Sequence, residues 1–269
     1  MSGALLAELR RTNFSGRSVS LAEGALVVAG TVALAARTGR ASETLTLAGI
    51  GALGLVDDLL EPRQRRAGLP VSKGLRGHLG ALRGGRLTTG AAKALGIPLL
   101  CLAGAAAGPA PRGGAMVLAD AALVAGSANL ANLLDLRPGR ALKAVLPSAA
   151  LLMLARPATP RAETGHRLAQ AALLPGLVAL PADLREHGML GDAGANVLGA
   201  AAGTAATRLL PAPARIGLLG GVVALTLASE KVSFSAVIER TPALRALDRL
   251  GRRPAPTAPP RTAPEGEGR

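Results

Sequence analysis

Carboxylate and amide side chains gather at the ends of apolar segments along this chain. The run GIGALGLVDD ends in Asp57 and Asp58, and the segment SANLANLLD carries Asn129, Asn132 and Asp135 at every third position. This spacing puts the last three side chains on one side of a helix. Because ionised carboxylates are costly at mid-depth in a bilayer, such positions mark the places where apolar spans would meet water.

A further carboxylate, Asp192, lies between glycines in GDAGAN, at the start of another apolar segment. Clustered carboxylates and amides suit a hard cation that keeps water and substrate phosphates among its ligands, which predicts Mg²⁺ or, as an alternative, Mn²⁺. A Cys-based metal site is excluded because Cys101 is the only cysteine in the sequence. The simpler interpretation, that Asp57, Asp58 and Asp192 cap helices, stays open at this stage.

Cations are mixed with glycines in the segment 61–89, which follows Asp58 closely. Glycine lets backbone N–H groups approach an anion, so this composition suits phosphate capture. Its charged and imidazole side chains are Arg63, Arg65, Arg66, Lys73, Arg76, His78, Arg83 and Arg86. The alternative is a solvated basic loop whose charges only set the membrane topology.

The whole chain has the composition of a membrane protein, since 49% of its 269 residues are hydrophobic and 18% are charged. Soluble domains carry more charge, and apolar runs close to the ~20 residues that cross a bilayer recur along the sequence. We therefore predict an all-α, polytopic membrane helix bundle of about eight transmembrane helices. Their expected positions are 21–37, 44–60, 90–107, 114–134, 140–156, 166–182, 190–209 and 213–230.

Basic residues are divided unequally between the two sides of that bundle. The segments on one side hold 22 Lys and Arg residues, those on the other side hold eight, and Lys93 lies inside a span. By the positive-inside rule, both termini and the loop after Asp58 are cytoplasmic. Because the charge follows membrane topology, the net charge of +14 indicates contact with lipid headgroups and nucleotide phosphates, and we expect no nucleic acid partner. Asp120, in the outer half of its span, has no evident companion and is interpreted as structural.

These features divide the chain into four parts. We expect residues 1–20 to form a cytoplasmic N-terminal segment and residues 21–231 to form a transmembrane catalytic-type domain. Residues 232–251 alternate apolar and charged side chains, which is typical of an amphipathic segment on the cytoplasmic surface. Residues 252–269 are rich in Pro, Ala, Arg and Glu and are predicted to be disordered.

The order of four short motifs resembles that of a known family. GLVDD, KG-x-x-GH, N-x-x-N-x-x-D and GDAGAN follow one another on the predicted cytoplasmic face, and the opening TNFSGRSVS is similar to the first cytoplasmic loop of the same family. Over about residues 10–240 the chain resembles, as a divergent member, the polyprenyl-phosphate N-acetylhexosamine-1-phosphate transferase superfamily (glycosyltransferase family 4). That superfamily includes the phospho-N-acetylmuramoyl-pentapeptide transferase of peptidoglycan synthesis.

The resemblance implies a magnesium-dependent, multi-pass enzyme of the bacterial plasma membrane with a cytoplasmic active face, acting in cell-envelope polysaccharide or peptidoglycan synthesis. In this family the phosphate of a polyprenyl phosphate lipid attacks the β-phosphorus of a UDP-sugar, and UMP leaves. By the family pattern Asp58 and Asp192 hold the metal, and Asp57 acts as a base or positions the lipid phosphate. The implied substrate-side residues are Lys73, Arg76 and His78 for phosphate, and Asn129, Asn132 and Asp135, with Arg137 nearby, for the nucleotide.

The sequence also departs from the family pattern. Where the family has a second Asp after Asp135, this chain has Pro138, and the histidine-rich C-terminal loop and the usual first and last spans have no counterpart. These departures affect the residues that the family uses to recognise the donor sugar more than they affect the magnesium site. A catalytically divergent regulator or scaffold of envelope synthesis is therefore the main alternative, and a small transporter is another. The sequence leaves open the sugar, the polyprenyl length and whether the protein forms a homodimer.

Overall fold

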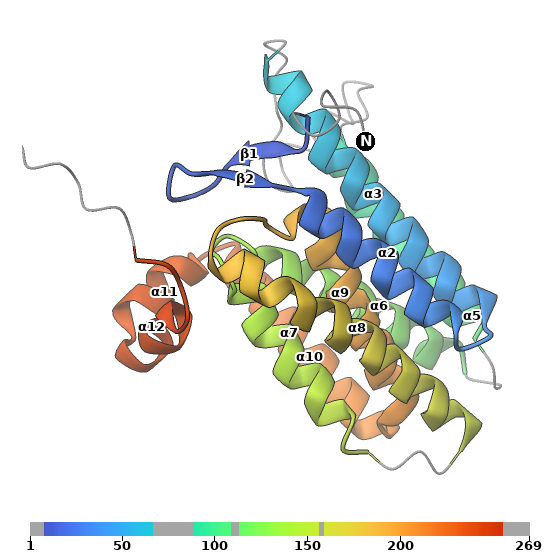
Figure 1. Ribbon diagram of the computed structural model, residues 1–269. Coiled ribbons are helices and arrows are strands. Elements are labelled where there is room, and N and C mark those ends of the chain that lie inside the picture. The colour runs from blue at the N-terminus through green and yellow to red at the C-terminus, as the bar shows by residue number, and fades with distance from the viewer. Residues whose placement is uncertain (1–7, 67–88, 109–112, 156–158, 255–269) are drawn as a thin grey trace, which may run out of the picture.

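The computed structural model describes residues 8–66, 89–108, 113–155 and 159–254 (Figure 1). Within these ranges it contains ten helices and one short two-stranded hairpin, so the expected all-α class is confirmed. The first eight helices run alongside one another in a bundle, and the last two lie beside it (Figure 1).

The bundle helices coincide with the eight apolar segments predicted from the sequence. Most of their ends lie within a few residues of the expected boundaries, although α3 and α8 extend further, into charged residues. The helices are α2 (Ala22–Ala36), α3 (Ala41–Arg66), α5 (Thr89–Ala106), α6 (Gly114–Leu134), α7 (Arg140–Leu152), α8 (Pro160–Leu184), α9 (Gly191–Leu209) and α10 (Ala212–Ser229).

Helix α9 is the central element of the bundle, where it contacts α2, α3, α6, α7 and α8. Its sequence GDAGANVLGAAAGTAATRL consists largely of small residues, and nearly all of them are buried. Small side chains let neighbouring helices approach closely. A Cβ on Gly54 of α3 would lie 2.4 Å from the Cα of Ala193. A side chain at that position would therefore push α3 away from α9.

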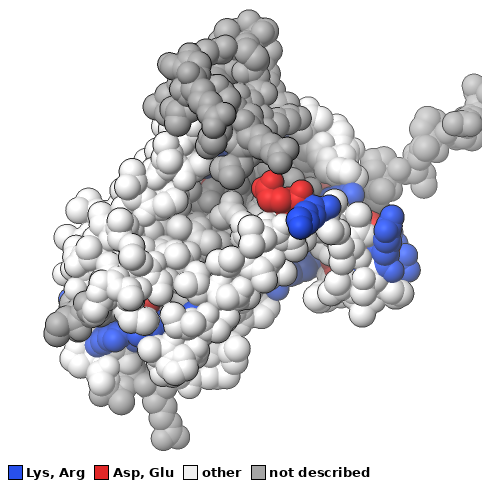
Figure 2. Space-filling view, turned by 180° about the vertical axis from the view of Figure 1, so that it is seen from behind, with Lys and Arg blue, Asp and Glu red and all other residues white. Residues whose placement is uncertain are grey.

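The outer surface of the bundle is apolar. By length and composition, α5, α6 and α10 could each cross a membrane, and large apolar side chains such as Leu99, Val178 and Leu227 are exposed. Among the described residues on the face shown in Figure 2, most carry no charged side chain. An exposed apolar surface of this extent indicates that the protein associates with a membrane.

Two buried ion pairs join helices at one end of the bundle. Asp120 of α6 pairs with Arg215 of α10 at 2.6 Å, and Glu43 of α3 pairs with Arg208 of α9 at 2.8 Å. The expectation that Asp120 lacks a companion was wrong, and its structural role stays a prediction. The pair could not be predicted from the sequence, because its members are 95 residues apart and no motif links them.

A β-hairpin that the sequence did not predict precedes the bundle. Strands β1 (Arg10–Thr12) and β2 (Ser18–Ser20) pair antiparallel. The Asn13 side chain organises the turn by accepting hydrogen bonds from the backbone N–H groups of Ser15 and Arg17. Strands of three residues are too short for a recognisable alternation of apolar and polar side chains, which is why the sequence gave no sign of them.

The hairpin is fastened to the end of the bundle that carries Asp57 and Asp58. Arg17 forms an ion pair with Glu186 at 2.7 Å, and Arg11 donates to the backbone carbonyl of Asp58. The backbone N–H of Met189 donates to Ser20 at 3.1 Å. The described part of the N-terminal segment, which was expected to be cytoplasmic, therefore packs against this end of the bundle.

The amphipathic segment predicted at 232–251 forms helices α11 (Phe234–Arg240) and α12 (Pro242–Arg249). A buried charge cluster holds them to the bundle, because Asp248 accepts a hydrogen bond from Arg140 Nε at 2.8 Å and Lys143 donates to the Asp248 carbonyl. Arg252 continues these contacts by donating to the carbonyl of Pro138 at 2.9 Å. The predicted tail thus makes contacts at its start, and residues 255–269 lie outside the described part of the chain.

We expect Asp248→Asn to release α12 from the bundle. Removing one partner of a buried pair commonly costs about 3–5 kcal/mol, and both Asp248 and Arg140 are buried. Limited proteolysis should therefore cut the α11–α12 segment faster in this variant. Glu239→Gln, in the exposed pair of Glu239 with Arg249, is the matched control and should have almost no effect. Equal protection of Asp248→Asn and the unaltered protein would refute this role.

The same contact predicts a pH dependence. Burial raises the pKa of Asp248, but the hydrogen bond from Arg140 and the charges of Arg252 and Lys143 outweigh burial and hold the pKa below its usual value. A lowered carboxyl pKa stabilises the docked state above the unfolded pKa of about 3.9, and this contribution is lost as the pH falls through the folded-state pKa. Protection from proteolysis should be constant from about pH 8 to pH 5 and should fall below about pH 4.

Candidate active site

Lys93 joins two of the predicted carboxylates across three helices. Its Nζ donates to Asp57 Oδ2 at 2.8 Å and also to Asp192 Oδ2, so α3, α5 and α9 meet at one ammonium group. Asp57 is only 6% exposed, and an ionised carboxylate at such a position needs a cationic partner. Two carboxylates that share one positive charge therefore form a compact site that can hold a cation.

Asp58 makes different contacts from its neighbour Asp57. Its two carboxylate oxygens accept hydrogen bonds from the backbone N–H groups of Asp192 and Ala193, each at 3.0 Å. These N–H groups belong to the first turn of α9 and have no partner within the helix. Gly191 has a φ of +60°, and a Cβ there would lie 2.9 Å from the Asp58 carboxylate. Glycine at this position lets α9 begin directly against α3.

A cleft of about 480 Å³ lies between the hairpin, the α6–α7 connection and the segment that precedes α9. At its wall the Arg137 guanidinium stacks on Phe14, with Cζ 3.2 Å from the ring centroid. The cleft volume falls in the range of small-molecule sites. Its polar lining residues are Thr12, Asn13, Asp135, Arg137, Asp183 and Ser235.

Asp135 links the cleft to the carboxylate site. Burial raises the pKa of Asp135 well above its usual value, and the negative charges of Asp183, Asp192, Asp58 and Glu23 raise it further. Repulsion strong enough to shift a pKa acts between groups that are close in space. Acidic side chains from four helices therefore lie near the end of α6.

The remaining predicted residues are only partly placed. Asn129 is exposed, and neither Asn129 nor Asn132 lines the cleft, although both precede Asp135 on α6. The predicted phosphate ligands Lys73, Arg76 and His78 lie outside the described residues. The nucleotide-side role of the two asparagines stays a prediction without a described contact to the cleft.

Sequence analysis missed two residues of this region. Lys93 carries a signal that could have found it, because a lysine inside an apolar span needs an acidic partner. Asp183 accepts a hydrogen bond from the Gly139 backbone N–H at 2.6 Å and thereby holds the α6–α7 connection beside α8. No motif marks Asp183, so only the fold could place it in the cleft.

The residues present fit a magnesium ion. Lys93 Nζ marks a point that Asp57 and Asp192 both reach, and Mg²⁺ is commonly held by one or two carboxylates together with water and substrate phosphates. Within the described ranges no group of three or more His, Cys, Asp and Glu side chains is arranged to hold a metal ion. The other ligands of a bound Mg²⁺ or Mn²⁺ would therefore come from water and substrate.

Comparison with known proteins finds no match to this chain, neither among protein-family models nor among curated proteins nor among solved structures. The functional conclusion therefore depends on the site itself. Its components are the two carboxylates that share Lys93, the adjoining acidic groups and the cleft beside them.

Proposed function

We propose that the protein transfers a sugar-1-phosphate from a UDP-sugar to polyprenyl phosphate with release of UMP. The observation that carries the proposal is the convergence of Asp57 and Asp192 on Lys93, beside a cleft whose lining includes Asp135. Three of these residues belong to the motifs that resemble the polyprenyl-phosphate N-acetylhexosamine-1-phosphate transferases. Phosphoryl transfer depends mainly on positioning and charge neutralisation, which a site of this composition can supply.

In the proposed reaction a phosphate oxygen of the lipid forms a bond to the β-phosphorus of the UDP-sugar. The bond from that phosphorus to the bridging oxygen breaks, UMP leaves with the electron pair, and a lipid-diphospho-sugar remains. A phosphate monoester has a second pKa near ~6, so the attacking group is largely ionised at neutral pH and Asp57 need not act as a strong base. Magnesium, when bound, would neutralise charge on the diphosphate.

The contacts favour a revised division of roles among the carboxylates. Asp57 and Asp192 reach a common point and would hold the cation, whereas the sequence-based prediction named Asp58 and Asp192. Both carboxylate oxygens of Asp58 accept hydrogen bonds from backbone N–H groups at the start of α9. Asp58 would therefore position Asp192. A cation at this point would take the place of the Lys93 ammonium group, which could then bind a phosphate oxygen, and Arg137 would contact the donor in the cleft.

The experiment that tests this function is a screen for UMP release. Purified protein is incubated with polyprenyl phosphate, Mg²⁺ and a panel of UDP-sugars. Release that requires both the lipid and the metal is expected for at least one donor. Release without lipid would identify a hydrolase, and no release with any donor would favour the alternative function below.

The alternative is a catalytically divergent regulator or scaffold of envelope synthesis. Two observations favour it: Lys93 already neutralises the carboxylates that would hold the metal, and Pro138 lines the cleft where the family has an acidic residue. Such a protein keeps the fold without the reaction. It would bind neither Mg²⁺ nor a UDP-sugar at the cleft, which calorimetry on the purified protein can measure.

We further propose that all eight bundle helices cross the bacterial plasma membrane, with both termini and the active face cytoplasmic. The support is the positive-inside asymmetry of 22 against eight basic residues. In a Cys101→Ser background, Ser18→Cys in the hairpin should react with a membrane-impermeant thiol reagent only after permeabilisation. Arg37→Cys, in the α2–α3 connection, should react in intact cells. Labelling of Ser18→Cys from outside would overturn this topology.

The donor is expected to differ from that of the phospho-N-acetylmuramoyl-pentapeptide transferase. Proline offers no side-chain acceptor and no N–H, so Pro138 cannot replace a carboxylate that binds a base or sugar. Each unpaired buried polar group costs about 1–3 kcal/mol. We predict that this protein will not rescue a strain depleted of that transferase. Rescue at normal expression would show that Pro138 and the absent histidine-rich loop do not decide donor choice.

A further inference from the structure

Helix α12 has an apolar side and a basic side, and both sides are exposed. Leu244 and Leu247 are three residues apart and share the leucine side, where Leu247 is 53% exposed. Arg245 and Arg249 are four residues apart and share the arginine side. Because each residue advances about 100° around a helix, Leu247 and Arg249 lie on nearly opposite sides. Between them Asp248, which is 5% exposed, faces the bundle.

Buried contacts fix α12 against two bundle helices, beside which it lies in Figure 1. Asp248 accepts a hydrogen bond at 2.8 Å from Nε of Arg140, the first residue of α7. Beyond the helix, the backbone N–H of Arg253 donates at 3.2 Å to the carbonyl of Leu184, the last residue of α8. These contacts set the orientation of α12, so its two exposed sides point in fixed directions.

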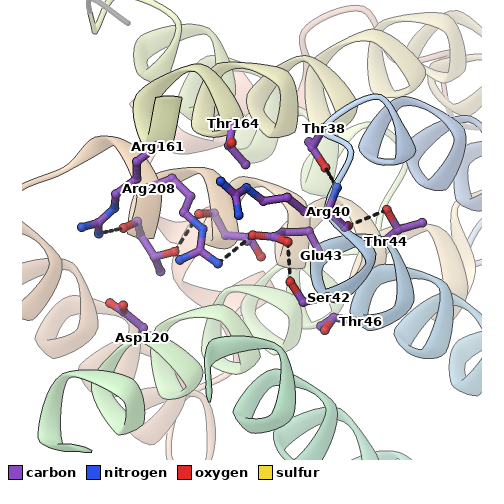
Figure 3. A network of polar contacts seen from close by, with 12 residues as sticks. Thr38, Arg40, Ser42, Glu43, Thr44, Thr46, Asp120, Arg161, Thr164 and Arg208 are labelled. Atoms are coloured by element: carbon purple, nitrogen blue, oxygen red, sulfur yellow. Dashed lines mark hydrogen bonds and ion pairs between the residues drawn. The ribbon is translucent and has the colours of Figure 1, made fainter. Parts of the chain in front are cut away.

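The level of α12 along the bundle is close to one edge of the apolar surface. Asp192 and Arg208 are 16 residues apart on α9, and Figure 3 shows Arg208 reaching toward Glu43 at the far end. These two charged levels are about 24 Å apart along the helix, which is close to the ~30 Å hydrocarbon thickness of a bilayer. The connection that precedes α7 lies at the level of Asp192, because Pro138 and Met189 line the same cleft. Helix α12 therefore lies near the level at which hydrocarbon would meet headgroups.

The exposed apolar surface continues from α10 toward α12. Helix α10 is long and apolar enough to cross a membrane, and only four residues separate it from α11. Exposed apolar side chains follow one another along this path, at Leu227 on α10, at Val232 in the connection and at Val237 on α11. A bilayer that covers α10 would therefore also come close to the leucine side of α12.

We propose that α12 lies on the membrane leaflet at the candidate-site end of the bundle, with Leu244, Leu247 and Leu250 inserted and the arginine side in water. A helix with this division of side chains lies in the plane of the interface, with its apolar side about 5–10 Å into the boundary of headgroups and acyl chains. The inference rests on the membrane association of the bundle and is independent of the transferase reaction. Because Arg140 also donates to Ser235 at 2.9 Å in the wall of the cleft, the lipid surface would hold that wall in place through α12.

The test uses single tryptophan reporters, because the sequence contains no Trp and no Tyr. Leu247→Trp and Arg249→Trp place the reporter on opposite sides of α12, and Leu227→Trp places it on the apolar surface of α10. All three positions are exposed, so the fold should tolerate these changes. Each full-length variant is reconstituted in bilayers of phosphatidylcholine and phosphatidylglycerol. Its emission is compared with that in bilayers whose phosphatidylcholine carries bromine on the acyl chains, which quenches Trp in the hydrocarbon.

We expect brominated lipid to lower the emission of Leu247→Trp and of Leu227→Trp by roughly half, and that of Arg249→Trp by less than about a tenth. Acrylamide in the aqueous phase should quench the three reporters in the reverse order.

Quenching of Leu227→Trp without quenching of Leu247→Trp would overturn the proposal. If Leu247→Trp were then also shielded from acrylamide, a protein surface would cover the leucine side in place of lipid. Equal quenching of Leu247→Trp and Arg249→Trp would overturn the orientation of α12 and with it the proposal. Absence of quenching at Leu227→Trp would contradict the membrane association itself. None of these readouts depends on UMP release, so they are separate from the test of the proposed function.

Discussion

Replacing Asp192 by Asn is expected to lower the rate of sugar-1-phosphate transfer by at least about 100-fold while the protein stays folded. The variant removes one of the two carboxylates that converge on Lys93, and with it charge that would hold the metal against the diphosphate. A loss of this size corresponds to roughly 3 kcal/mol of transition-state stabilisation. The measurement is the initial rate of UMP release, with the unfolding midpoint recorded in parallel.

Asp58→Asn is the informative comparison for that variant. Its side chain accepts hydrogen bonds from Asp192 and Ala193 N–H groups, and an amide offers only one acceptor oxygen where the carboxylate offers two. We therefore expect Asp58→Asn to lose activity and also about 1–3 kcal/mol of stability. If Asp192→Asn retained near-normal turnover, the assignment of the metal to Asp57 and Asp192 would be wrong.

Lys93→Met is expected to make the stability of the protein depend on magnesium. Without the ammonium group, the buried Asp57 and the adjacent Asp192 face each other without a cation. Uncompensated buried charge costs about 3–5 kcal/mol, so the unfolding midpoint should fall in the absence of divalent metal. Magnesium should restore it by binding the same two carboxylates. The variant should also lose transferase activity, because a phosphate-binding cation is gone.

The matched control is Lys231→Met, which removes an exposed lysine beyond the end of α10. Its unfolding midpoint should show no new response to Mg²⁺. A Lys93→Met protein whose midpoint is equally insensitive to Mg²⁺ would mean that the two carboxylates do not form a cation site. This readout is separate from activity, so it remains informative if the natural donor is missing from the assay.

The helices were predictable because each follows an apolar run, and a run close to the ~20 residues that cross a bilayer leaves few alternatives to a helix. The small residues of α9 fit its central place, because they let other helices approach it closely, but that place was not predicted. Which helices are neighbours was not predictable. The pairs of Asp120 with Arg215 and of Glu43 with Arg208 join segments far apart in sequence, and nothing in the local pattern records that contact.

The sequence indicated which carboxylates belong to the candidate site. It did not indicate which groups those carboxylates contact. Asp57, Asp58 and Asp192 stood out because ionised carboxylates are costly at mid-depth in a bilayer, so acids at the ends of apolar runs mark where spans would meet water. The interpretation of Asp58 as a helix cap and the interpretation of the region as a functional site are both compatible with the structure: Asp58 binds the start of α9 while Asp57 and Asp192 share Lys93. The adjacent residues Asp57 and Asp58 contact different groups, and the sequence does not show which of them contacts which group.

The central claim is most directly tested by following the β-phosphate of the donor. Purified protein is supplied with Mg²⁺, polyprenyl phosphate and a UDP-sugar that carries ³²P in the β-phosphate and ¹⁴C in the sugar. Sugar-1-phosphate transfer predicts that both labels enter the lipid phase in equal amounts, that unlabelled UMP appears with them, and that Asp192→Asn abolishes the transfer. Entry of ¹⁴C without ³²P, or retention of both labels in water with every donor tried, would contradict the proposed reaction.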